Sequence, residues 1–248
     1  MDVPSFTAQD TGLIERLIRV FNAPRLSFAA VRQRETSLDW FVPAALAVAV
    51  GIACYFATLP ITLDPDTPPL QTQLERMSEE EQQSYLQGMR QWGWMSVPVE
   101  VFSTLVIVSA ILLFLARSVF SRDVTYQQML IAKGYACMVL VPEWLVRTLL
   151  TLIKKSPAVY TGLGAFVPPQ LAPTFAGRVL ASLDLFDFWQ AWLMGLGLAV
   201  MAEVSTKRAI IAVMVLWGLW IIAGSAVESM RPPLPPPDPA TAPAPAPG

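Results

Sequence analysis

The 248-residue chain has no histidine, only two cysteines and few charged residues. Histidine is the commonest metal ligand and the commonest general base near neutral pH, so its absence argues against metalloenzymes and acid–base catalysts. Cys54 and Cys137 fall within long apolar stretches, where we interpret them as small buried hydrophobic residues rather than a disulfide or a metal pair. No GxSxG motif and no basic block interleaved with aromatic residues occurs. We therefore expect no enzymatic activity, no cofactor, no metal and no nucleic-acid partner.

Apolar residues dominate instead, with 54% hydrophobic and 15% charged residues. Stretch 97–116 would rise about 30 Å as a helix, which is the thickness of a hydrocarbon core. Within lipid every backbone N–H and C=O must be paired internally, so such stretches must be helical. The sequence predicts an all-α polytopic membrane protein, a bundle of five transmembrane helices with amphipathic surface helices. The predicted spans are 41–61, 97–116, 127–153, 184–204 and 209–227.

We expect three parts: cytoplasmic amphipathic N-terminal helices over 1–40, a membrane domain over 41–228, and a disordered proline-rich tail over 229–248. An external helical arm over 62–96 is expected between the first two spans. The apolar but Pro- and Gly-rich loop 156–182 favours a cap on the outer helix ends, with a re-entrant segment as the alternative.

Residues 11–21 predict an amphipathic helix at the membrane surface. Leu13, Leu17 and Phe21 recur at helical spacing, and Arg16 and Arg19 would reach anionic headgroups. We interpret this helix as a surface anchor; a docking site for a cytoplasmic partner is the alternative.

The distribution of Lys and Arg predicts the orientation of the spans. These residues are more frequent before the first span and after the second and fourth spans than on the opposite side. The N-terminal MDVPSFTAQD lacks the cationic start and apolar core of a cleavable signal peptide. We predict a multi-pass protein of the cell inner (cytoplasmic) membrane, with its N-terminus cytoplasmic and its C-terminus outside.

Small residues recur every fourth position in two of the spans and predict close helix packing. We favour packing within the chain, with homo-oligomer formation as the alternative. The residues are Ala45, Ala49, Ala53 and Ala57 in the first span and Ala191, Gly195 and Ala199 in the fourth.

Charged residues within or at the ends of the spans are costly in lipid and are usually paired or functional. With the predicted orientation, five of them would gather toward the outer face, whereas Lys133 would reach the cytoplasmic headgroups. We interpret the five mainly as polar contacts that join helices; a cation, proton or polar-substrate site is the alternative. They are Glu100, Glu143, Arg147, Asp184 and Asp187.

Three stretches resemble a known family. Arg25-Leu26-Ser27-Phe28 follows Asn22-Ala23-Pro24, Thr125-Tyr126-Gln127-Gln128 precedes Gly134-Tyr135-Ala136 and Pro142, and a third runs from Leu183-Asp184-Leu185 through Asp187 to Gly195-Leu196-Gly197. Their order and spacing over about 22–227 are similar to those of the Yip-domain family (Ypt/Rab-interacting-protein domain), in its bacterial branch.

The resemblance implies a five-span membrane protein with a cytoplasmic N-terminus and no established enzymatic activity. Eukaryotic relatives act in vesicle trafficking and bind small GTPases and one another; we do not carry that role to this chain. Some bacterial members work beside ABC-type exporters, which implies an accessory role.

Two functions follow. The first is a non-enzymatic scaffold or accessory subunit of a membrane complex, for example an ABC-type exporter, which binds the lipid bilayer and a membrane-protein partner or a second copy. The alternative is a small transporter or channel that uses the carboxylate and arginine cluster.

Overall fold

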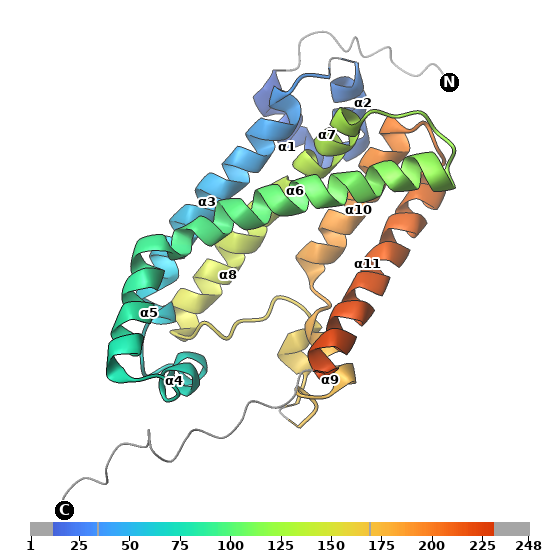
Figure 1. The fold of residues 1–248 in the computed structure, drawn as a ribbon. Helices are drawn as coiled ribbons and strands as arrows, with labels where there is room; N and C mark the ends of the chain where they lie inside the picture. Colours follow the sequence, from blue (N-terminus) through green and yellow to red (C-terminus); the bar gives the residue numbers. More distant parts are fainter. Residues whose placement is uncertain (1–11, 34, 169, 231–248) are drawn as a thin grey trace, which may run out of the picture. The chain divides into compact units, whose positions relative to one another are not determined.

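A computed structural model of the chain describes residues 12–33, 35–168 and 170–230. Within these ranges the chain forms helices and turns, with one isolated antiparallel bridge between Gly162 and Asp184. This confirms the predicted all-α class. The α-helices (Figure 1) are α1 Leu13–Asn22, α2 Pro24–Arg32, α3 Leu38–Thr62, α4 Pro68–Leu74, α5 Glu79–Trp92, α6 Ser96–Phe114, α7 Tyr126–Ala136, α8 Leu140–Lys154, α9 Phe175–Ala181, α10 Leu185–Met201 and α11 Thr206–Met230.

In the described ranges, four helical segments are long and apolar enough to cross a membrane, so the polytopic membrane fold is also confirmed. α10 is apolar but has 17 residues, which as a helix span about 26 Å, slightly less than a hydrocarbon core. α10, which corresponds to the predicted fourth span 184–204, is therefore shorter than each of the four long segments. The four long segments are Leu38–Thr62, Glu79–Val119, Tyr126–Lys154 and Thr206–Met230.

Short 3₁₀ and π-helical turns occur within two of these long segments, next to the α-helices. The 3₁₀ turn Gly93–Met95 connects α5 to α6, and a π-helical turn, Leu115–Val119, ends α6. Another 3₁₀ turn, Cys137–Val139, separates α7 from α8. Pro142 lies just after this turn; proline cannot donate a backbone hydrogen bond, so the regular α-helical pattern is interrupted here.

The chain divides into two compact units. The boundaries fall inside long helices, so that each unit contains parts of α3, α6, α8 and α11. The first unit comprises Met1–Ala49, Glu100–Pro142 and Leu185–Trp220, and the second comprises Val50–Val99, Glu143–Asp184 and Ile221–Gly248.

The core of the first unit surrounds α10, which packs against α7 and α2. Phe28 of α2 and Tyr135 of α7 are fully buried, with ring centroids 5.9 Å apart. Gly197 makes this packing close: a Cβ there would lie 2.9 Å from the Cβ of Ala132 and 3.1 Å from the Phe28 ring. α10 is thus covered by protein along most of its length.

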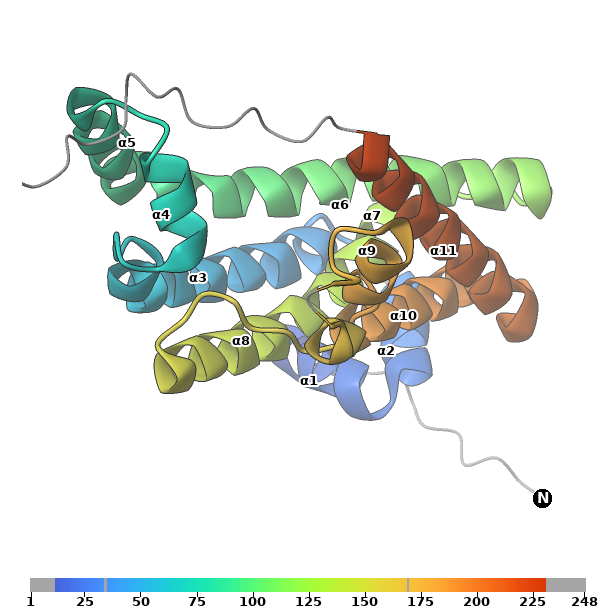
Figure 2. The ribbon, with the colours of Figure 1, turned by 90° about the horizontal axis from the view of Figure 1, so that it is seen from below.

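The helical hairpin of α1 and α2 belongs to this core (Figures 1 and 2). Leu17 and Val20 of α1 are buried, whereas Ile14 and Ile18 are exposed, Ile14 by 73%. The apolar face of α1 therefore packs mainly against protein.

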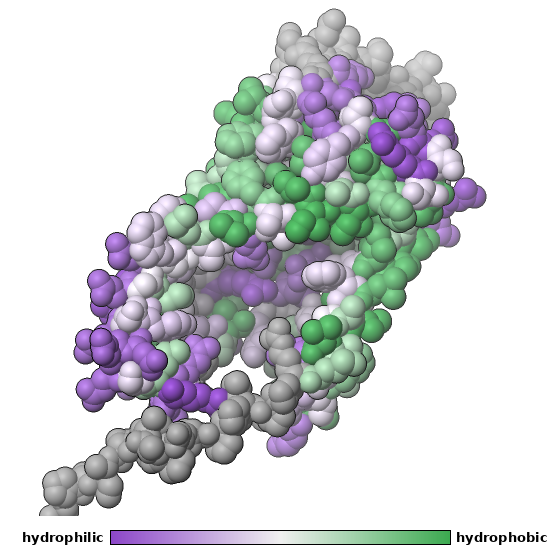
Figure 3. Space-filling model, viewed as in Figure 1, coloured by the Kyte–Doolittle hydropathy of each residue, from purple (hydrophilic) through white to green (hydrophobic). Residues whose placement is uncertain are grey.

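The surface of the first unit is apolar over α6 and α11 (Figure 3). Val106 and Ile107 of α6 and Val215 and Leu219 of α11 are exposed there. Hydrophilic residues gather around segment 115–125 and the turn between α10 and α11. This pattern suits a lipid-facing band next to a polar membrane surface.

In the second unit, α3 packs closely against α8. A Cβ on Gly51 would lie 2.3 Å from the Trp144 ring, so a larger residue here would have to displace that side chain. The Tyr55 hydroxyl donates a 2.6 Å hydrogen bond to the Met89 carbonyl of α5. The predicted arm 62–96 thus forms two helices, α4 and α5, of which α5 is attached to α3.

α5 begins with a complete capping box. The Ser78 hydroxyl accepts a hydrogen bond from the Glu81 backbone N–H at 3.3 Å, and the Glu81 carboxylate accepts one from the Ser78 N–H at 2.8 Å. The bonds from Ser78 stabilise the carboxylate and hold the pKa of Glu81 below its usual value. α5 is polar and has no buried residues. It therefore lies outside the apolar part of the long segment Glu79–Val119, which it begins.

The proline-rich tail is predicted over 229–248; residues 229 and 230 belong to α11, and residues 231–248 lie outside the described residues, as do residues 1–11.

Candidate functional site: buried ion-pair networks

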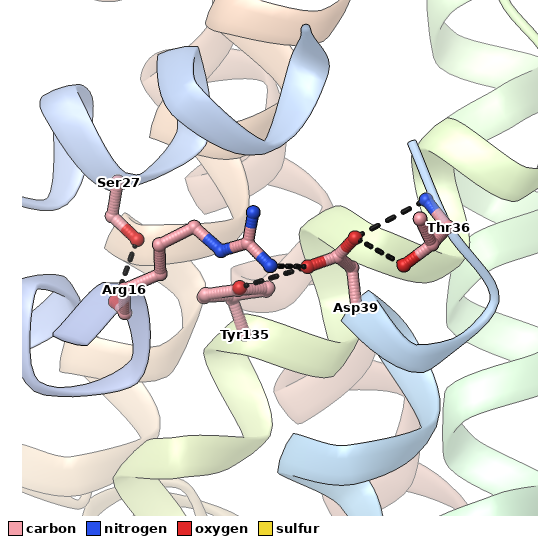
Figure 4. A network of polar contacts seen from close by, with 5 residues as sticks. All are labelled: Arg16, Ser27, Thr36, Asp39 and Tyr135. Atoms are coloured by element: carbon pink, nitrogen blue, oxygen red, sulfur yellow. Dashed lines mark hydrogen bonds and ion pairs between the residues drawn. The ribbon is translucent and has the colours of Figure 1, made fainter. Parts of the chain in front are cut away.

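A buried ion pair joins α1 to α3 in the first unit (Figure 4). Arg16 Nη2 lies 2.9 Å from Asp39 Oδ1, and the two side chains are 11% and 0% exposed. The Tyr135 hydroxyl donates to the same carboxylate oxygen at 3.3 Å. The Thr36 hydroxyl and backbone N–H donate to Asp39 Oδ2 at 2.7 and 3.1 Å. We call Arg16, Thr36, Asp39 and Tyr135 the Asp39 network.

Local sequence explains where Asp39 lies. The run Thr36-Ser37-Leu38-Asp39 places a carboxylate in the first turn of α3, where helix N-termini favour negative charge. Arg16 reaches it because α1 is held against α2, whose Ser27 hydroxyl donates to the Arg16 carbonyl at 2.8 Å.

Chemically, the Asp39 network is suited to joining helices. Its carboxylate accepts four hydrogen bonds or ion-pair contacts, from α1, α7 and the start of α3, and this leaves little capacity for a substrate. Removing one member of a buried ion pair leaves an uncompensated charge, which costs about 3–5 kcal/mol. The network therefore fixes the α1–α2 hairpin to the bundle, and the prediction that Arg16 reaches the headgroups is wrong.

Lys133 of α7 is also buried, with 3% of its surface exposed. Its ammonium donates a 2.8 Å hydrogen bond to Oε1 of Gln190 on α10. The prediction that Lys133 extends to the cytoplasmic headgroups is therefore wrong. The side chain instead links the two helices at the centre of the first unit.

A second network, in the second unit, contains three of the five predicted cluster residues. Arg147 Nε lies 3.1 Å from Glu143 Oε1, one helical turn earlier on α8. Arg147 Nη2 donates to Asp184 Oδ2 at 3.2 Å, and the Thr161 hydroxyl donates to the same oxygen. Glu143 and Asp184 are buried, whereas Arg147 is 39% exposed. We call Glu143, Arg147, Thr161 and Asp184 the Arg147 network.

The Arg147 network attaches segment 156–184 to α8. Asp184 immediately precedes α10, and Thr161 lies beside the bridge between Gly162 and Asp184. One guanidinium between two carboxylates carries a formal charge of about −1, which would favour a cation nearby. The same geometry also serves as a polar contact between helix and loop.

The structure places the other two predicted cluster residues in the first unit. Glu100 is exposed near the start of α6, and Asp187 is half-buried in the first turn of α10. The Asp39 network lies entirely in the first unit, and the Arg147 network lies entirely in the second.

The two small-residue stripes have different environments. Ala191, Gly195 and Ala199 of α10 are buried, and a Cβ on Gly195 would lie 2.7 Å from the Ile210 Cα of α11. On α3, Ala45 is half-buried, and Ala49, Ala53 and Ala57 are exposed. Within the described chain, α3 buries Ala44, Ala47 and Gly51 instead of this stripe.

Neither Asp39 nor its pairing with Arg16 was predicted from the sequence. One signal was available: an acidic residue three positions after Thr36, at the start of an apolar run, is typical of helix N-termini. No local pattern indicates its pairing with Arg16, which lies 23 positions earlier.

Together, the apolar helices and internally paired charges define a helical multi-span membrane protein. Residues 18–227 match the family model of the Yip1 domain, and because this match covers most of the chain, the protein belongs to the Yip1 domain family. This confirms the family resemblance noted in the sequence. Searches of curated proteins and of solved structures gave no match.

Proposed function

We propose that the protein is a non-enzymatic scaffold or accessory subunit that binds another membrane protein through α3. The observation that carries the proposal is the outward direction of Ala49, Ala53 and Ala57. Small residues at a lipid-facing surface gain nothing from lipid, whereas they allow a second helix to approach closely. This face is therefore suited to a helix of a partner or of a second copy.

The paired charges support the same proposal. Asp39 and Asp184 each accept from several groups of the chain itself, as joints between helices do. An exporter of ABC type is one partner that fits an accessory role in the inner membrane. We further propose that the N-terminus is cytoplasmic and the C-terminus outside.

The test is copurification from mild detergent, combined with cross-linking in membranes. Ala53→Leu inserts a bulky side chain at the centre of the exposed stripe and should lower recovery of the partner or dimer by about tenfold, equivalent to about 1.4 kcal/mol. Ala110→Leu is the matched control, because Ala110 is an exposed alanine of an apolar span on α6. Equal recovery with both variants, or recovery of the bare monomer from the wild type, would contradict the proposal.

A small transporter or channel is the second candidate, favoured by the two carboxylates around Arg147. Proteoliposomes should then show cation flux that falls with Glu143→Gln or Asp184→Asn. Asp187→Asn serves for comparison, since Asp187 lies in the other unit. Flux that is equal in the wild type and all three variants would remove this candidate.

A further inference from the structure

The described residues of segment 156–184, between α8 and α10, expose six large apolar side chains. Phe166 is the most exposed, at 82%. The charged residues of this segment are Arg178 and Asp184, and both are paired, with Glu228 at 3.6 Å and Arg147 at 3.2 Å. The exposed large apolar residues are Tyr160, Leu163, Phe166, Leu171, Phe175 and Leu180.

Backbone packing holds this segment in place, so that its apolar side chains cannot simply turn inward. The Leu163 N–H donates to the Leu183 carbonyl at 3.0 Å, and a Cβ on Gly162 would lie 2.1 Å from that carbonyl oxygen. A Cβ on Gly177 would lie 1.8 Å from the Leu171 carbonyl oxygen. Both contacts require glycine, and they fix the two short helical turns of the segment, Leu163–Phe166 and α9.

We propose that segment 156–184 lies in the interfacial layer of the bilayer and inserts its apolar side chains among the lipids. Continuity with α8 identifies lipid as the occupant. Leu149, Leu152 and Ile153 are exposed on this apolar spanning helix, and the chain passes from them directly into the segment. An apolar surface that continues a lipid-facing one, and whose two charged residues, Arg178 and Asp184, are both paired, is suited to the same solvent.

The depth of the segment follows from its neighbours and from its backbone. Lys154 and Lys155, exposed at the end of α8, can extend to the headgroups, and Tyr160 follows them as interfacial aromatic residues do. Outside the turn Leu163–Phe166, the backbone of 156–168 and 170–174 is not helical, so it cannot enter the hydrocarbon core, where unpaired polar groups would lack partners. The segment therefore lies at the level of the headgroups and the upper acyl chains. This inference does not depend on the proposed scaffold role.

Site-directed spin labelling of the full chain in lipid nanodiscs tests the proposal. In a Cys54→Ser/Cys137→Ala background that elutes like the wild type, one label is attached at Phe166→Cys and, separately, at Phe175→Cys. We expect oxygen, which concentrates in lipid, to broaden both spectra strongly, whereas a water-soluble nickel chelate should not. The matched control is Gln83→Cys on the polar, exposed helix α5, where the nickel chelate should broaden the spectrum.

Two other outcomes would overturn the proposal. Broadening by the nickel chelate at 166 and 175, equal to that at 83, would place the segment in water. An immobilised spectrum that neither reagent broadens would show that a second copy or a partner protein covers the segment. Both labelled positions are exposed, so the labels should not disturb packing, and agreement between the two guards against a local effect of either substitution.

Discussion

At the scale of single residues, Asp39 is a buried carboxylate that joins three helices of the first unit. It has no exposed surface and holds α1, the start of α3 and α7 together. Burial removes the hydrogen bonds that water would donate to the carboxylate, and Arg16, Thr36 and Tyr135 replace them.

We expect Asp39→Ala to lower the free energy of unfolding by about 3–5 kcal/mol, since it leaves the Arg16 guanidinium buried and unpaired. Unfolding in mixed micelles measures the loss. Glu15→Ala is the control, because its pair with Arg19 is largely exposed and should contribute about 1 kcal/mol or less. The double variant Arg16→Met/Asp39→Leu should recover part of the loss, and purely additive effects would contradict the buried pair.

The sequence identified charged residues within the spans, but local spacing indicates a partner for only some of them. Glu143 and Arg147 are four positions apart, so their pairing follows from helical geometry. Arg147 and Asp184 meet only because segment 156–184 folds back on α8, which no periodicity encodes. The pairing of Lys133 could not be predicted either, because its partner Gln190 is 57 positions away in the sequence.

At the scale of helices, the contact between α10 and α11 depends on a missing side chain. Gly195→Ala would place a Cβ 2.7 Å from the Ile210 Cα, and backbone cannot yield as a flexible side chain can. We expect a loss of about 1–3 kcal/mol in the free energy of unfolding. Gly218→Ala on α11 is the matched control, since nothing lies within 4 Å of its Cβ position, and it should be neutral or stabilising by up to about 1 kcal/mol. Equal losses in the two variants would contradict the close approach.

The capping box of α5 predicts a pH dependence. The pKa of Glu81 is lowered in the folded helix, so its contribution is present above the unfolded pKa, near 4.5, and is lost as the pH falls through the folded value. The first turn of α5 should therefore open more in acid, measured by hydrogen exchange of its amides from neutral pH down to below that range. Ser78→Ala should open the same turn already at neutral pH, by about 1 kcal/mol. No change in that turn with either treatment would contradict the capping box.

The two alanine and glycine stripes show what periodicity can and cannot predict for a helix. Both have the same spacing, and in lipid both faces of a span are apolar, so hydropathy does not distinguish inside from outside. α10 buries its stripe because α11 lies against Gly195, whereas α3 turns Gly51 inward instead of Ala53. The helices themselves were predictable, and their rotation about their axes was not.

At the scale of the whole molecule, the short α10 decides how many times the chain crosses the membrane. Its 17 residues fall just below the usual length of a span, but α2 and α7 cover it, so it needs less lipid-facing length than a peripheral helix. Five crossings place the two termini on opposite sides of the membrane, and four place them on the same side.

We expect opposite sides, with the N-terminus in the cytoplasm. Labelling with a membrane-impermeant thiol reagent checks this in intact cells, using a single cysteine at either terminus of the Cys54→Ser/Cys137→Ala background. Only the C-terminal cysteine should react until the membrane is opened. Equal reactivity of both termini in intact cells would show that α10 does not cross.

The burial of Phe28 has a consequence for the order in which the helices pack during synthesis. Its ring lies beside Tyr135 of α7 and Gly197 of α10, which the ribosome produces more than a hundred residues after α2. The α1–α2 hairpin is made before both of these helices, so it cannot reach its final position until α10 has been made. Until then Phe28, Val31 and the inner face of α1 stay exposed, so this hairpin precedes its partners in synthesis but packs only after them.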